Sequence, residues 1–215
     1  MILTIDPEKP ACVILRPLIF LSLFLVLISC SSNFELNPGN TDPDQFQGVL
    51  FDDFETPVLG GGGWTWGDST QGASASISLV RQGAKFGKGC GRIDFKPGKG
   101  IGCGAAEASP YQGQGVNAVL AKRLVIWVKA PDSIHFQVHI HNRLEEISTP
   151  YLSTALQGYG RWWAYSVPMA NFSPAITQIA PLTTTANSGS INSVGIFVPG
   201  GQKEGTILID NIYFQ

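Results

Sequence analysis

All three histidines of the chain lie in one short segment in which apolar and polar residues alternate. The segment reads IHFQVHIHN over residues 134–142. Because successive side chains of a β-strand point to opposite faces, one face would be apolar and the other would carry the polar side chains. Those polar side chains are His135, Gln137, His139 and His141. This face suits three roles, namely a ligand-binding groove, a metal site or plain solvated surface.

A metal site on this face would use His139 and His141, whose spacing can present two imidazoles to one zinc ion. A zinc site needs a third protein ligand, and the sequence offers no evident one. A groove is therefore the favoured interpretation, ahead of solvated surface and of metal.

Tryptophans are candidates for the other half of a binding site. Trp64 and Trp66 follow four glycines and point the same way if the backbone is extended, whereas Trp162 and Trp163 are adjacent and would point to opposite faces. The apolar face of a sugar ring stacks on such rings, while its hydroxyls bond to planar polar side chains. Trp64, Trp66 and Trp162 therefore join the His-face residues as candidate ligand-binding residues. Burial in the core remains equally open for each tryptophan.

Strands must position these side chains, because apolar residues recur mostly at a period of two and no segment predicts a long amphipathic helix. Nine strands are predicted, at 49–55, 74–81, 89–95, 101–107, 124–129, 134–142, 162–167, 193–198 and 206–214. Many short strands between turn-rich segments indicate an all-β fold, an antiparallel β-sandwich.

The last predicted strand, TILIDNIYF, changes its apolar phase midway. Ile207 and Ile209 fall on one strand face, whereas Ile212 and Phe214 fall on the other. A β-bulge at Asp210–Asn211 would restore one buried face and redirect the aspartate side chain.

The N-terminal part of the chain predicts export rather than fold. An uncharged apolar run ends at Ser29 and is too short to span a bilayer, which takes about 20 residues, so residues 1–29 are interpreted as a signal peptide. The tetrapeptide LISC resembles a bacterial lipobox, which would make Cys30 the lipidated mature N-terminus. Cleavage of an ordinary secretory signal near residues 29–33 is the alternative. Polar residues 30–47 then form a tether, and residues 48–215 form the folded domain.

Two cysteines remain in that domain. Cys90 and Cys103 flank the segment GRIDFKPGKGIG, and a hairpin turn near Lys96–Pro97 would place them opposite each other within disulfide reach. A disulfide suits an oxidising envelope, and two free buried thiols are the alternative.

Five segments in order resemble carbohydrate-binding modules of family 11 and the related galactose-binding-like type. They are VLFDDFET, GGGW, LVIWVKA, WWAYSVPMANF and ILIDNIYF. The resemblance implies a jelly roll, a polysaccharide-binding concave sheet, and a structural calcium ion held between the first and last strands by Glu55 and Asp210. Acidic residues crowded near the first strand suit such a hard cation.

The function expected from these features is non-catalytic glycan binding at the bacterial envelope, with a lipid anchor in the outer membrane. The sequence contains none of the common catalytic motifs, so no catalytic residue is predicted. A net charge of -2 without a basic run argues against nucleic acid as a partner. The alternative is a structural or assembly lipoprotein that uses the same sandwich to hold an envelope protein.

Overall fold

The computed structural model describes residues 35–36, 48–59, 62–108, 115–118, 120–142, 151–173 and 190–215. Cys30, the predicted signal peptide and most of the predicted tether lie outside these residues. Phe34–Gln215 form one compact unit. Within the predicted tether, Glu35–Leu36 form a short strand, β1, that pairs with the strand Trp162–Pro168 of the sandwich. In the described part of the chain, no helix is long and apolar enough to cross a membrane.

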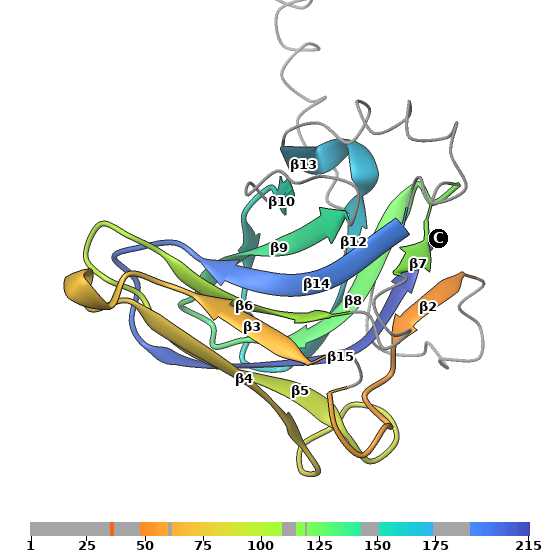
Figure 1. Ribbon diagram of the computed structural model, residues 1–215, viewed down its shortest axis with the longest axis horizontal. Helices are drawn as coiled ribbons and strands as arrows, with labels where there is room; N and C mark the ends of the chain where they lie inside the picture. Colours follow the sequence, from red (N-terminus) through yellow and green to blue (C-terminus); the bar gives the residue numbers. More distant parts are fainter. Residues whose placement is uncertain are drawn as a thin grey trace, which may run out of the picture. The chain divides into compact units, whose positions relative to one another are not determined.

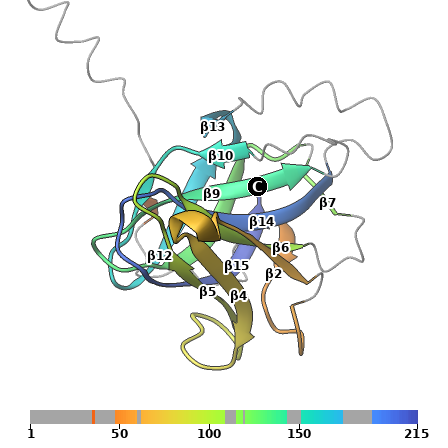
Figure 2. The same cartoon turned by 60° about the vertical axis from the view of Figure 1, so that its left-hand side comes forward.

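The described strands form two antiparallel sheets, which lie one above the other in Figures 1 and 2. Sheet A has the order β1-β12-β8-β15-β5-β4, with β2 paired to β15. Its further strands are β2 (Val49–Asp52), β4 (Ser74–Val80), β5 (Cys90–Lys96), β8 (Arg123–Lys129), β12 (Trp162–Pro168) and β15 (Gly205–Phe214).

Sheet B has the order β13-β10-β9-β14-β6-β3, with β11 paired to β9 and β7 paired to β14. Its strands are β3 (Gly63–Trp66), β6 (Cys103–Ala108), β7 (Val116–Asn117), β9 (His135–Asn142), β10 (Tyr151–Ser153), β11 (Leu156–Gln157), β13 (Phe172–Ser173) and β14 (Ser190–Val198). Two short 3-10 helices, η2 (Ser69–Gln71) and η3 (Met169–Asn171), lie between strands. The predicted all-β sandwich is confirmed.

Alternation of side chains gives each sheet one buried face and one outer face. On β9, Phe136, Val138 and Ile140 are fully buried, as the alternating sequence predicted. They pack with the inward residues of β8 and β15 into one core between the sheets. Each of the nine predicted strands is present, with shifted ends. The pattern did not predict β3, which begins in a run of glycine. It also did not predict the two- and three-residue strands, which are too short to show a period.

The predicted bulge in β15 is confirmed. The register of β15 against β8 shifts between Asp210 and Ile212, and Asn211 takes a positive φ of 41°. As a result, Ile209 and Ile212 are both fully buried although they are three residues apart. The bulge therefore keeps the apolar face of β15 continuous.

The predicted hairpin between the two cysteines is wrong. β5 lies in sheet A and β6 lies in sheet B, so the turn after Lys96 carries the chain from one sheet to the other. The thiol of Cys103 is hydrogen-bonded by the backbone of Lys96, which ends β5. Cys90 lies at the beginning of the same strand. Those two ends are six residue steps apart along β5, about 20 Å at 3.3 Å per step. A disulfide is excluded by that distance, and both cysteines are buried free thiols.

Candidate functional site

The outer face of sheet B brings together most of the predicted ligand-binding residues. Pairing of β3, β6, β14 and β9 aligns two rows of outward side chains across the sheet. One row is Trp66, Gly104, Phe197 and Gln137, and the other is Trp64, Ala106, Gly195 and His139. Segments more than 130 residues apart in the chain thus meet on one surface, which we call the aromatic face.

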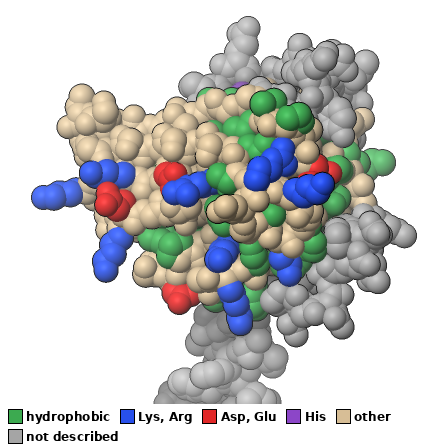
Figure 3. Space-filling model, turned by 90° about the horizontal axis from the view of Figure 1, so that it is seen from below, with side chains coloured by type: hydrophobic (Ala, Val, Ile, Leu, Met, Phe, Trp, Pro, Cys, Tyr) green, Lys and Arg blue, Asp and Glu red, His purple; other side chains and the backbone are tan. Residues whose placement is uncertain are grey.

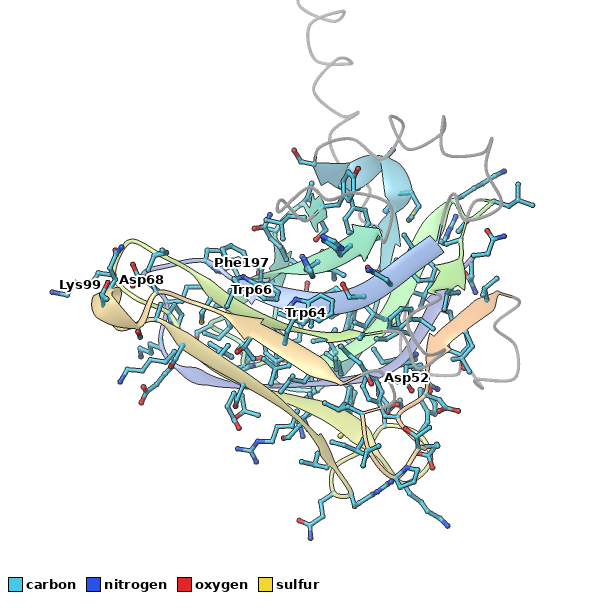
Figure 4. All side chains as sticks on the ribbon, viewed as in Figure 1. Asp52, Trp64, Trp66, Asp68, Lys99 and Phe197 are labelled. Carbon is cyan, nitrogen blue, oxygen red and sulfur yellow. The ribbon has the colours of Figure 1, made fainter. Side chains whose placement is uncertain are left out.

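Small residues form the middle of the aromatic face and leave its aromatic rings standing above the backbone. A Cβ on Gly104 would lie 2.5 Å from Cζ2 of Trp66, so the indole lies directly over this glycine. The ring of Phe197 occupies the space that a Cβ on Gly102 would take. Figure 4 shows Trp64, Trp66 and Phe197 on the same side of the sheet. With 39% of its surface exposed, Trp64 presents a flat apolar ring to solvent.

Polar planar groups border the rings on the β9 side. The half-buried Gln137 donates Nε2 to the Ser153 carbonyl at 2.6 Å, which fixes the amide plane. Nδ1 of His141 lies 3.2 Å from Oδ1 of Asn192 on the neighbouring strand. A stacking ring beside oriented amide and imidazole groups is the combination that a sugar ring requires.

His139 supports this surface from below instead of contacting a ligand. Its side chain is 3% exposed, and its ring centroid lies 4.8 Å from that of Trp66. Burial, together with the neighbouring His141, lowers the pKa of His139 to about 3, so the ring is neutral at physiological pH. The predicted ligand role is therefore corrected to packing beneath Trp66.

The metal interpretation of the histidines gains no support. The rings of His139 and His141 lie 6.4 Å apart, and the described residues contain no group of three His, Cys, Asp or Glu side chains that could hold a metal ion. His135 lies at the start of β9, exposed, with its backbone bonded to the Gln202 side chain. The side chain of His135 is on the same face of β9 as Gln137, His139 and His141, but at the end of that row.

Trp162 does not belong to the aromatic face, which corrects the prediction. It lies on β12 and pairs with Lys129 on the outer side of sheet A, where its indole donates to the Gly83 carbonyl at 3.1 Å. The adjacent Trp163 points to the other side and packs against the core. The two do point to opposite faces, as predicted, but β12 belongs to the other sheet.

Phe197 is the site residue that the sequence analysis missed. It alternates with Val194, Ile196 and Val198, which are fully buried, so its outward direction was readable from the predicted strand. What the sequence did not reveal is which strand would lie beside it.

The predicted calcium carboxylates meet at the loop between β4 and β5. Oδ2 of Asp210 accepts the backbone amides of Lys85 and Phe86 at 2.8 and 3.0 Å. Oε1 of Glu55 accepts those of Lys88 and Gly89 at 2.7 and 2.8 Å. Both acidic residues therefore anchor the same loop.

Burial leaves Asp210 with an unusual electrostatic environment. Desolvation raises the pKa of this carboxyl to about 6, and the negative charge of Glu55 adds to the rise, while the loop amides oppose it. Its Oδ1 is buried and has no hydrogen-bond partner among the described residues. This oxygen suits a cation, whereas Oε1 of Glu55 is already engaged by two amides.

The anchored loop covers the part of the outer face of sheet A that carries Trp127. Phe86 packs edge-on against Trp127 with ring centroids 5.2 Å apart, and Nζ of Lys85 lies 4.8 Å from the Trp127 centroid. Trp127 is fully buried as a result.

Comparisons with known proteins agree with this architecture. No protein-family model matches the sequence, and no curated protein does. Among solved structures, the family 11 carbohydrate-binding module of a Clostridium thermocellum cellulosomal cellulase is similar, with a TM-score of 0.51 at 17% identity over 78% of this chain and 94% of that chain. A family 11 module from Clostridium thermocellum in complex with a β-1,3-1,4-mixed-linked tetrasaccharide gives 0.50 at 16% identity over 77% and 94%. The chain shares the jelly-roll fold of these modules, as the sequence resemblance implied.

Proposed function

We propose that the protein is a non-catalytic carbohydrate-binding module that binds a neutral oligo- or polysaccharide on the aromatic face. The alignment of Trp64, Trp66 and Phe197 above Gly104 and Gly195 carries this proposal, because it presents ring faces beside planar polar groups. The shared fold with modules of family 11 supports it.

Binding without catalysis is the chemistry that this face supports. Glycoside hydrolysis uses two carboxyl groups on either side of the bond to be cleaved. The outward side chains of the aromatic face, as far as the described residues extend, include no Asp or Glu. Stacking and neutral hydrogen bonds remain, so binding should be insensitive to salt.

Affinity electrophoresis through gels that contain neutral polysaccharides, mixed-linked β-glucan among them, tests this function. Trp64→Ala should abolish retardation of the purified chain, and His141→Ala should weaken it. Trp162→Ala is the matched control, because it removes the same side chain from the other sheet. Retardation that survives Trp64→Ala and Trp66→Ala would reject the aromatic face. If no polysaccharide retards the chain and the chain instead captures an envelope protein through this face, the assembly-protein alternative replaces glycan binding.

The cellular setting of this function is proposed from the sequence. Lipidation of Cys30 would anchor the module in the outer membrane of a bacterium and display it on a tether. Cys30→Ala should then release the protein to the soluble fraction, because the apolar run before it is too short to span the bilayer. A variant that stays membrane-bound after a salt wash would contradict the lipoprotein assignment.

A structural calcium ion at Asp210 is part of the same proposal. The buried Oδ1 of Asp210 is the oxygen that a cation would neutralise. Glu55, whose charge acts on Asp210, would contribute through Oε2, because the loop amides engage its Oε1. Bound there, calcium would stabilise the attachment of the β4–β5 loop to the last strand.

A further inference from the structure

A depression of about 910 Å³ lies on the outer side of sheet A, on the opposite side of the sandwich from the aromatic face. Its volume falls within the roughly 300–1,000 Å³ range of small-ligand sites. Its lining combines basic and apolar side chains, among them Arg81, Arg92, Lys129, Val80, Pro131 and Leu208.

Strand register builds the floor of this depression. Trp162, Lys129, Leu208 and Arg92 are paired in turn across β12, β8, β15 and β5, so they form one row of outward side chains. In this row, Leu208 lies between the cations Lys129 and Arg92, and Trp162 lies at the end next to Lys129.

The segment after β4 forms the wall of the depression. Trp162 donates its indole N–H to the Gly83 carbonyl, so Gly83 is held over the row. A Cβ on Gly83, whose φ is 83°, would lie 3.4 Å from Cδ1 of Leu208. The wall thus brings Arg81 to the same depression as Lys129.

Positive charge in the depression exceeds the negative charge beside it. Arg92 pairs with Asp94 at 2.9 Å, and its guanidinium keeps further N–H groups free of that pair. Arg81 donates to the Thr56 carbonyl. Among the described residues, neither Arg81 nor Lys129 has a carboxylate within ion-pair distance. Glu55, which bonds to the loop amides, is the acidic group whose charge interacts with Arg81.

The surface around the depression is basic as well. Figure 3, the view from below, shows Lys and Arg side chains spread over this side of the molecule and outnumbering the acidic ones, with hydrophobic patches between them. The chain as a whole carries a net charge of -2, so this distribution is local.

We propose that this depression is a second binding site, which takes an acidic saccharide unit. Lys129 and Arg81 receive the oxyanion, Arg92 supplies further N–H donors, and Leu208 and Pro131 contact the apolar side of the sugar ring. A uronic acid carboxylate and a sulfate ester share this chemistry. The site is separate from the aromatic face, so the chain would bind two glycan types on opposite sides.

Calorimetric titration of the purified chain with a galacturonate oligomer, a sulfated oligosaccharide and a neutral β-glucan oligosaccharide tests the proposal. Lys129→Met keeps the apolar stem and removes the charge, so it should weaken binding of the acidic ligand at least tenfold. Lys129→Arg should restore most of it. Lys99→Met is the matched control, because it removes an exposed lysine that does not line the depression and that Figure 4 shows beside Asp68 at one end of the domain. The preferred acidic oligomer distinguishes carboxylate from sulfate as the oxyanion.

The ligands separate this proposal from the proposed function. Lys129→Met should leave neutral glycan binding unchanged, and Trp64→Ala should leave acidic saccharide binding unchanged. Binding of the acidic ligand should weaken as salt rises from 50 to 300 mM, because the charges lie at a surface where a Debye length of about 8–10 Å applies. The second site is rejected if neither acidic saccharide binds at low salt, if Lys99→Met weakens binding as much as Lys129→Met, or if only anionic lipid vesicles bind.

Discussion

The outer faces of the two sheets are built from the same kind of strand, yet one exposes a tryptophan and the other buries one completely. On sheet B, Trp64 stands beside Ala106 and is 39% exposed. On sheet A, Trp127 is fully buried beneath Phe86 and Lys85 of the β4–β5 loop. Alternation along a strand decides toward which face an aromatic ring points. Loops that pack over that face decide whether the ring reaches solvent.

Two carboxylates hold the β4–β5 loop over Trp127 on sheet A. Asp210 and Glu55 together accept four backbone amides of the β4–β5 loop. Glycine is favoured where the loop passes Glu55, because Gly87 has a φ of 57° and a Cβ there would displace the Glu55 carboxylate. The loop is therefore held by specific polar contacts as well as by packing.

Removing each tryptophan in turn should give the largest contrast between the faces. Trp127→Ala should lower the free energy of unfolding by about 3–5 kcal/mol, because it leaves a cavity under the loop. Trp64→Ala should lower it by less than about 1 kcal/mol, because a surface side chain is lost. Urea unfolding of the two variants measures this difference. Equal losses of unfolding free energy in the two variants would mean that the loop over Trp127 does not make the two faces different.

Releasing the loop should have the next largest effect. Asp210→Ala removes the acceptor of two amides and should cost about 2–3 kcal/mol, since hydrogen bonds to charged groups contribute about 1.5–3 kcal/mol. Thermal melting measures the loss, and Asp132→Ala, which removes an exposed carboxylate, is the control. An unchanged melting temperature would show that packing alone holds the loop.

Chelation separates the amide anchor from a bound cation. If calcium binds at Asp210, excess chelator should lower the melting temperature of calcium-loaded protein, because an ion that binds only the folded state stabilises it. The chelator should then leave Asp210→Ala unaffected. A melting curve that does not move in chelator would remove calcium from the site while leaving the amide anchor in place.

The two faces should also respond to pH in opposite directions. The raised pKa of Asp210, about 6, means that its contribution to stability is greatest below pH 4 and is lost as pH rises through 6. The lowered pKa of His139, about 3, means that its contribution is present above pH 6.5 and is lost as pH falls. Between pH 4 and 6 the two slopes therefore oppose each other.

Substituting Asp210 or His139 alone should reveal how each residue changes the slope of stability against pH. Asp210→Asn should make stability increase more steeply with pH between 4 and 6, and His139→Gln should make it decrease with pH. One pKa unit corresponds to about 1.4 kcal/mol, so changes of about 1–2 kcal/mol across this window are expected. Calorimetry in calcium-free buffers measures them. If stability changes with pH in the same way in the wild type and both variants, Asp210 and His139 do not cause the pH dependence.

The smallest expected effect is that of a reducing agent. Cys90 and Cys103 lie at positions that no disulfide can join, and burial raises the pKa of the Cys90 thiol to about 11. A reductant should therefore leave the melting temperature unchanged, and both thiols should react with an alkylating agent only after unfolding. A decrease in melting temperature on reduction would mean that Cys90 and Cys103 do form a disulfide.

Local patterns in the sequence were sufficient for most of the strands. The alternation in IHFQVHIHN predicted both the buried and the outward residues of β9, and the phase change at Asp210–Asn211 predicted the bulge. These inferences succeed because a strand's side-chain period depends only on its own backbone. Trp64 and Trp66 were likewise expected to point the same way, although β3 itself was not among the predicted strands.

Tertiary structure alone decided which strands became neighbours, and thereby which residues became a site. Trp162 and Trp64 look alike in the sequence, but register assigns one to sheet A beside Lys129 and the other to sheet B beside Ala106. The cysteine prediction failed for the same reason, because a turn after Lys96 can close a hairpin or cross between sheets. Strand pairing depends on long-range contacts across the whole core, and no local stretch of residues encodes that choice.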